Sequence, residues 1–368
     1  MKKRTTKGVL ADVEQQASQC KTVAVDLAKQ VFQVAGEDAS GQVVYEERIR
    51  SREAFQRFLR ALPAGVRVLM ETGPGAQAWA REVQSSGKQA WLLPAQRVAE
   101  HRSGAKNDRK DAHALLRAGR DSDISPVPVK SVEALSMQAL HRVRSGYLQR
   151  RTAIGNQVRG LMLEQGIALP QGGVVMAERA ERVLEDATQP LPDLLRDLVA
   201  ELLAEWRHLG VRIDALTGRL ERAAQEDATA RRLMTVRGFG PVIATALVAK
   251  QTRPERFPNA RQFAAYFGLV PEQHSSGQKV RLGKMSKRGD GYLRSLTIEG
   301  AHAVLRQLRS DSEAADDRRL QRWLQRHGRK GAAVRLANRN LRIAWVLLQG
   351  NETYRRDPNH RRENAMKA

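Results

Sequence analysis

Two aspartates in a short polar stretch have a spacing suited to metal-dependent chemistry. Asp108 and Asp111 stand three residues apart within Lys106–Ala112, so a helix through this stretch would present both carboxylates on one face. Carboxylate oxygens are the ligands that hard divalent cations prefer. The stretch is also rich in lysine and arginine, and a solvated, salt-bridged start of a helix is the alternative interpretation.

Two further acids close apolar segments upstream. Asp26 ends the run Thr22-Val-Ala-Val, and Glu71 ends the run that begins at Val66. A carboxylate at the end of a buried strand is costly unless a cation binds it. We therefore expect Asp26, Glu71, Asp108 and Asp111 to converge on a pocket for a divalent cation.

The elements that must position these acids indicate an α/β domain over residues 20–125, after a polar lead-in over 1–19. Hydrophobic alternation and turn residues predict five strands and two helices, and Ser51 has the pattern of a helix N-cap. The strands are expected over 21–26, 31–36, 42–50, 66–71 and 89–94, and the helices after Ser51 and over 75–86. This order resembles that of a ribonuclease H-like domain, in which acids from the first strand, the fourth strand and a later helix meet on one side of the sheet.

The composition points to a polyanionic partner. The chain has 368 residues, 63 Lys and Arg against 40 Asp and Glu, and a net charge of +23. Basic proteins gain affinity for DNA or RNA by releasing counterions from phosphates. The single cysteine, Cys20, excludes an internal disulfide framework or a cysteine-based zinc site. No apolar run has the length of a membrane span, so a cytoplasmic protein without a membrane partner is expected.

The middle of the chain, residues 126–228, is predicted to be a helical, coiled-coil region. The prolines of Ser125–Pro128 end the first domain, and apolar residues then recur at helical spacing over 132–165 and 191–225. A break rich in proline and glycine lies at 169–173. We expect an antiparallel helical pair. Its role is either subunit association or nucleic-acid contact, and the sequence does not choose between them.

A third region over 229–350, followed by a basic tail over 351–368, contains two further motifs. Gly238-Phe-Gly240 reads as a tight turn between two helices. Glycines of this kind let the backbone approach a phosphate, although a plain helix connector is the alternative. Ser275-Ser276-Gly277 is a polar loop followed by many basic residues, and its residues by themselves indicate a turn. The expected phosphate contacts are Lys279, Arg281, Lys284, Lys287, Arg288 and Arg294.

Several of these blocks together resemble one family. The segments beginning at Asp26 and Glu71 and the stretch 106–112 resemble the D, E and DxxD blocks of the DEDD transposases of bacterial insertion sequences. The run from Phe263 to Arg294 resembles their C-terminal transposase domain. The resemblance implies a RuvC-like N-terminal domain, in which the tetrad Asp26, Glu71, Asp108 and Asp111 binds Mg²⁺ or Mn²⁺. It also implies that Ser276 is the nucleophile, with Ser275 as the alternative.

The same resemblance implies a function. A recombinase of this kind cuts and rejoins DNA through a covalent serine–DNA intermediate, assembles as a homo-oligomer (a dimer or a tetramer), and uses a structured guide RNA, a bridge RNA, to select its sites. Each active site would join the acids of one subunit to the serine of another. Two alternatives stay open: an endonuclease that resolves Holliday-type junctions with water and no serine adduct, and a nucleic-acid-binding protein without catalysis.

Overall fold

The computed structural model describes residues 16–102, 108–251, 253–274, 281–312 and 314–354. The chain divides into two compact units, residues 1–131 and 132–368, and each is considered by itself. No helix within the described ranges is long and apolar enough to cross a membrane.

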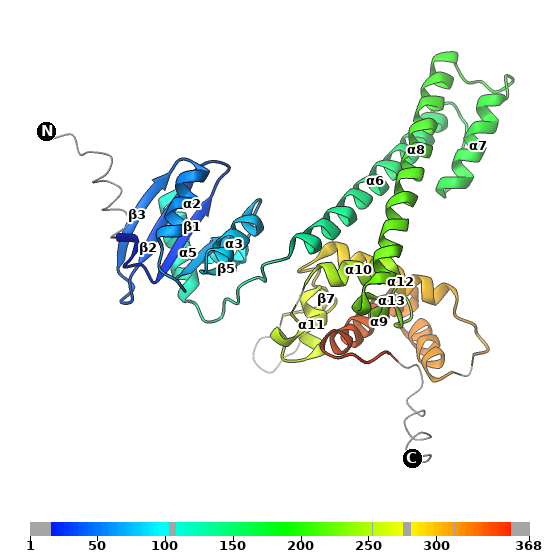
Figure 1. The fold of residues 1–368 in the computed structure, drawn as a ribbon. Helices are drawn as coiled ribbons and strands as arrows, with labels where there is room; N and C mark the ends of the chain where they lie inside the picture. The colour runs from blue at the N-terminus through cyan, green and yellow to red at the C-terminus, as the bar shows by residue number, and fades with distance from the viewer. Residues whose placement is uncertain (1–15, 103–107, 252, 275–280, 313, 355–368) are drawn as a thin grey trace, which may run out of the picture. The chain divides into compact units, whose positions relative to one another are not determined.

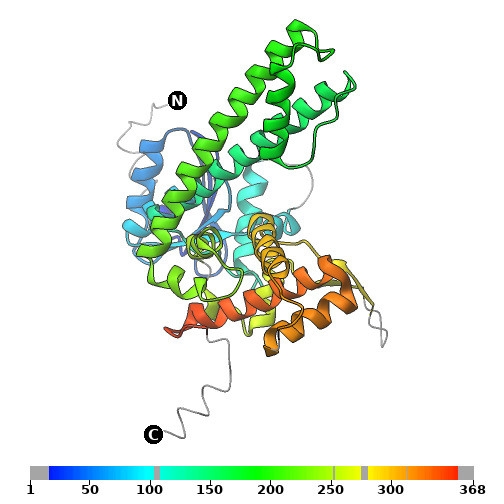
Figure 2. The same ribbon diagram turned by 90° about the vertical axis from the view of Figure 1, so that its right-hand side faces the viewer.

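The first unit is built on one mixed sheet of five strands in the order β3-β2-β1-β4-β5 (blue to cyan in Figures 1 and 2). β1 and β4 are parallel neighbours, as are β4 and β5, whereas β2 is antiparallel to both β1 and β3. The strands are β1 (Thr22–Leu27), β2 (Phe32–Glu37), β3 (Val43–Ile49), β4 (Arg67–Glu71) and β5 (Gln89–Leu93).

Helices cover both faces of this sheet because successive side chains of a strand point to opposite faces. Val23 and Val25 of β1 belong to the core under α2 (Arg52–Ala61) and α3 (Ala76–Ser85). Ala24, between them, belongs to the opposite core. That core lies under α4 (Ala95–Glu100) and α5 (Asp108–Arg120).

The predicted strands and helices of this unit agree with the structure to within one or two residues at their ends. Ser51 is the N-cap of α2, and its hydroxyl accepts a hydrogen bond from the Ala54 amide at 3.1 Å. The mixed sheet, followed by a helical region, is compatible with the expected ribonuclease H-like class.

The second unit begins with an antiparallel helical pair, seen in green in Figures 1 and 2. The C-terminal part of α6 (Val132–Leu163) packs on the N-terminal part of α8 (Asp193–Glu226). At the other end of the pair, the Arg144 side chain donates to the Thr217 hydroxyl at 2.8 Å. α7 (Gly173–Glu185) lies between α6 and α8 in the chain and buries Met176 and Val183 in the same core.

The rest of the second unit shares one large core. α13 contains one non-helical residue, Gly328, whose φ of +66° separates two helical segments. The elements are α9 (Ala228–Met234), α10 (Pro241–Ala249), η1 (Pro254–Arg256), α11 (Ala260–Tyr266), β6 (Pro271–Gln273), β7 (Leu282–Met285), α12 (Gly291–Arg306) and α13 (Ala315–Gln349).

A buried histidine joins three helices of this unit. His141 of α6 is only 4% exposed, and its ring lies 3.1 Å from the Thr245 hydroxyl of α10 and 3.0 Å from the Tyr292 hydroxyl of α12. The single proton of the Thr245 hydroxyl goes to the Pro241 carbonyl at 2.7 Å, so this hydroxyl accepts from Nε2–H. Nδ1 then accepts from Tyr292. This arrangement requires a neutral ring, and burial lowers the pKa of His141 to about 4.

We predict that His141 makes the protein sensitive to acid. An unfolded histidine binds a proton below about pH 6.5, whereas folded His141 resists protonation down to about pH 4. Stability is therefore lost as the pH falls from 6.5 to 4, by roughly 3 kcal/mol at most. Denaturant titrations of His141→Gln between pH 7 and pH 4 should show a flatter pH dependence than wild type. His208→Gln, at an exposed position, is the matched control, and an equal flattening in that variant would contradict the assignment.

Candidate active site

Asp26 and Glu71 lie next to each other at the ends of parallel strands. The register of β1 and β4 pairs Val25 with Met70, so the following residues, Asp26 and Glu71, are neighbours. Two positions before them, Ala24 and Leu69 face the core under α5. Because side chains alternate along a strand, both acids are on the α5 face of the sheet, and both are half-buried.

α5 brings Asp111 to this face. Its apolar residues, among them Ala112 and Leu115, pack in the same core as Ala24 and Leu69. The Asp111 side chain is only 7% exposed. Asp108 opens the helix one turn earlier, at the end where the helix dipole favours an acidic residue; its side chain lies outside the described residues.

One guanidinium holds two of these acids together. Arg102 Nε lies 2.9 Å from Asp111 Oδ1, and Arg102 Nη2 lies 2.7 Å from Glu71 Oε2. A carboxylate as buried as Asp111 needs such a partner, because an unpaired charge in the protein interior is very costly. Arg102 is a residue of the site that the sequence does not reveal. It stands six residues before Asp108, a separation that does not by itself reveal the contact.

Ion pairs on the opposite edge of α5 fix the helix against the sheet. Glu46 of β3 binds both Arg109, at 2.6 Å, and His113. Burial acts to raise the pKa of Glu46, but the hydrogen bonds from Arg109 and His113 hold it below its ordinary value. Glu37 of β2 pairs with Arg120 near the end of the helix. These contacts position the acids of α5.

The donor atoms of the site are of the type that hard cations prefer, but Glu71 and Asp111 are arranged as an ion pair with Arg102. Asp26, Glu71 and Asp111 supply carboxylate oxygens on one face, and the Arg102 guanidinium places positive charge between two of them. Across the residues with described side chains, which exclude Asp108, no three His, Cys, Asp or Glu side chains form a group that could hold a metal. Binding a metal through Glu71 and Asp111 together would require Arg102 to give up these contacts.

The predicted nucleophile, Ser276, lies outside the described residues, as do Ser275 and Lys279. β6 and β7, which precede and follow residues 275–280, pair in antiparallel fashion. The His274 amide donates to the Arg281 carbonyl at 2.8 Å. The role of Ser276 stays a prediction.

The predicted phosphate-binding residues differ in their surroundings. Arg281, Lys284, Lys287 and Arg288 are exposed. Arg294 is half-buried, and its Nη1 donates to the Phe267 and Arg288 carbonyls at 3.2 and 3.3 Å. Arg294 therefore has a structural task that the other four lack.

The two glycines of the Gly238-Phe-Gly240 turn also differ. Gly238 has a φ of +92°, and a Cβ there would lie 2.9 Å from the Gly300 carbonyl oxygen of α12. Gly238 is thus explained by the close approach of two backbones. A Cβ at Gly240 would meet nothing within 4 Å, so the expected phosphate contact is left to Gly240 and the start of α10.

A mixed α/β domain with acids at its strand ends, followed by a helical region, is compatible with a ribonuclease H-like transposase. Two family models match the chain: a transposase model of the DEDD type over residues 23–166, and the model "Transposase IS116/IS110/IS902 family" over residues 230–316. The chain belongs to this family of transposases, enzymes that act on DNA.

Named relatives agree with this assignment. The chain is 41% identical to the "Probable family 20 transposase" of Pseudomonas aeruginosa over 90% of its own length and 98% of the relative. It is 33% identical to the transposase for insertion sequence element IS1111A of Coxiella burnetii, with 91% of each chain covered. It is 32% identical to the transposase for IS1328 of Yersinia enterocolitica, with 88% of this chain and 96% of the relative covered.

We predict that Arg102→Gln destabilises the first unit by about 2 kcal/mol, because it leaves the Asp111 carboxylate buried without its cation. Adding Asp111→Asn to this variant should restore part of the loss, since the uncompensated charge disappears. Equilibrium denaturation of the two single variants and the double variant measures the coupling. Arg97→Gln, whose side chain is 41% exposed, is the control and should change stability by less than about 0.5 kcal/mol. Additive losses in the double variant would show that the Arg102–Asp111 pair carries no coupling.

Proposed function

We propose that this transposase cuts and rejoins DNA through a covalent bond between Ser276 and DNA, at a site that also requires Asp26, Glu71, Asp108 and Asp111. The observation that carries the proposal is the convergence of Glu71 and Asp111, 40 positions apart in sequence, on one guanidinium beside the end of β1. An ordinary surface ion pair does not need a nearly buried aspartate beside the ends of two parallel strands.

The proposed step is a transfer of a phosphoryl group. The Ser276 oxygen attacks phosphorus, a new O–P bond forms, and the bond from phosphorus to the leaving strand breaks. The serine loses its proton, and the leaving oxygen takes one up. Rejoining reverses the step with a different strand end, so no net energy source is needed.

The acids have the chemistry to hold Mg²⁺ or Mn²⁺, and such an ion, when bound, would stabilise charge on the attacking and leaving oxygens. Asp26, Glu71 and Asp111 would hold it together with Asp108. Arg102 binds the carboxylates of Glu71 and Asp111 and so keeps them close to each other, and in this proposal it would release them to the metal.

The acids and Ser276 belong to different units of the chain, residues 1–131 and 132–368. The proposal therefore extends to a homo-oligomer in which one subunit can supply the acids and another the serine. A structured guide RNA as a further partner is part of the proposal, supported by the strongly basic composition.

Two alternatives predict different products. An endonuclease that uses water would cut DNA with the same acids and form no adduct. A non-catalytic binding protein would need neither the acids nor the serine for its activity. The nearly buried Asp111 favours a site over a charged surface, and the serine decides between the two catalytic candidates.

We expect wild-type protein, incubated with labelled substrate DNA and Mg²⁺, to form a protein–DNA adduct that survives a denaturing gel. Ser276→Ala should lose the adduct and strand joining but retain DNA binding, because the basic surface is unchanged. Asp26→Asn should lose both activities while its circular dichroism spectrum stays that of wild type. His274→Ala is the control and should keep most of the activity. Efficient cleavage without an adduct would replace this proposal with hydrolysis, and an adduct in Ser276→Ala would move the role to Ser275.

We also expect DNA affinity to depend steeply on salt, as for a protein that displaces many counterions. Lys284→Gln and Arg288→Gln should each lower the slope of log affinity against log salt by about one. Arg294→Gln should mainly lower the unfolding temperature, since Arg294 donates to two carbonyls of the protein. Fluorescence anisotropy with a labelled duplex between about 50 and 200 mM salt, the range over which such contacts are usually compared, measures the slopes. A slope unchanged in Lys284→Gln and Arg288→Gln would remove these residues from the interface.

A further inference from the structure

The two segments of α13 enclose a groove in the second unit. Its walls come from the segment before Gly328, the segment after it, and the chain around Leu269 and Pro271. The volume is about 1130 Å³, more than the roughly 300–1,000 Å³ of an ordinary small-molecule pocket. Gly328 permits the change of direction, because its φ of +66° is one that other residues rarely adopt.

The lining of the groove is basic and contains one tryptophan. In the part of the chain that the structure describes, no Asp or Glu lines it. Trp323 is half-buried and packs against the large core of the second unit. The cations that line the groove are Arg319, Lys330, Arg335, Arg339 and Arg342.

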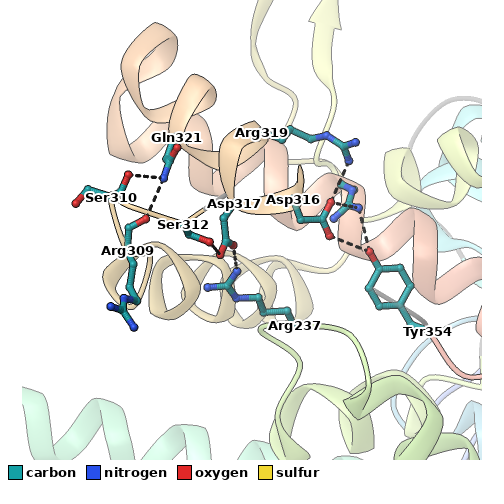
Figure 3. A network of polar contacts seen from close by, with 10 residues as sticks. Arg237, Arg309, Ser310, Ser312, Asp316, Asp317, Arg319, Gln321 and Tyr354 are labelled. Carbon is teal, nitrogen blue, oxygen red and sulfur yellow. Dashed lines mark hydrogen bonds and ion pairs between the residues drawn. The ribbon is translucent and has the colours of Figure 1, made fainter. Parts of the chain in front are cut away.

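An acid behind the groove fixes two of these cations and leaves the others available. Asp316 pairs with Arg319 at 3.4 Å and with Arg339 at 3.0 Å, so it joins the two segments of α13 (Figure 3). Tyr354 donates to the same carboxylate. The remaining three, Lys330, Arg335 and Arg342, are exposed, and among the described residues no ion pair engages them.

The arginines around the groove create a positive electrostatic field at His327. Desolvation and the charges of Arg335 and Arg326 hold the pKa of His327, which also lines the groove, below its ordinary value. A positive field of this kind attracts an anion. The aromatic ring beside it offers a flat apolar surface, which a simple anion does not use.

We propose that this groove binds an unpaired nucleic-acid strand, with a base stacked on Trp323 and the backbone phosphates beside Lys330, Arg335 and Arg342. Stacking platforms combined with basic grooves are how proteins hold single strands. A duplex fits this lining less well, because its bases are already stacked on one another and cannot reach the ring. The proposal rests on the protein acting on nucleic acid, and it does not depend on the covalent chemistry of Ser276.

The test is fluorescence anisotropy without Mg²⁺, with labelled oligo-dT, oligo-U and a DNA duplex of the same length. Trp323→Leu should weaken binding of the single strands about tenfold and leave duplex binding nearly unchanged. Trp323→Phe should retain most of the affinity, since a ring remains. Arg335→Gln should lower the salt slope for single strands by about one, whereas Arg322→Gln, at an exposed position of α13 outside the lining, should not.

The results separate this proposal from its failure. Selective loss for single strands in Trp323→Leu, with an unfolding temperature equal to that of Trp323→Phe, supports it. A preference for oligo-U over oligo-dT identifies RNA as the occupant, and the reverse identifies DNA. Equal losses for duplex and single strands, or no loss, would overturn it. Because the assay needs no cleavage, a failure here leaves the serine adduct untouched, and a missing adduct leaves this binding untouched.

Discussion

The arrangement of the first unit depends on how it accommodates the charge of Asp111. α5 packs on the sheet through small and aliphatic residues, yet it carries this carboxylate into a position that is only 7% exposed. Arg102 makes that position tolerable by binding Asp111 and Glu71 together. The pairs of Glu46 with Arg109 and of Glu37 with Arg120 then hold the helix along its length. The same contacts that stabilise the helix therefore gather the acids.

The sequence predicted the sheet well because its signals are local. Alternating apolar residues and turn residues locate each strand, and an acid at the end of a strand is visible without any tertiary information. Arg102 could not be recognised in this way, because its contacts with Glu71 and Asp111 follow from how α4 and α5 meet the sheet. The bounds of α7 are a different case: the proline and glycine residues before it predict a break, and its apolar positions pack only when α6 and α8 are in place.

The positive charge of the chain is unevenly distributed, and one end of the helical pair is acidic. This composition disfavours nucleic-acid contact at that end. Residues 160–206, which include the end of α6, all of α7 and the start of α8, contain nine Asp and Glu against three Arg and no Lys. A surface of this composition repels phosphates. The excess of positive charge consequently belongs to the rest of the chain, where the exposed residues around β7 and the groove of α13 lie.

The Gly238-Phe-Gly240 turn shows why a short motif carries less information than its surroundings. A Cβ at Gly300 would collide with the Gly238 carbonyl oxygen, so the two glycines require each other. Packing alone therefore accounts for Gly238, and a phosphate is not needed to explain it. Nearby, His141 of α6 binds a hydroxyl of α10 and a hydroxyl of α12, which holds α10, the helix after the turn, against α6 and α12. At Gly240, the other glycine of the turn, a Cβ would meet no atom within 4 Å. The backbone there is therefore accessible to a ligand.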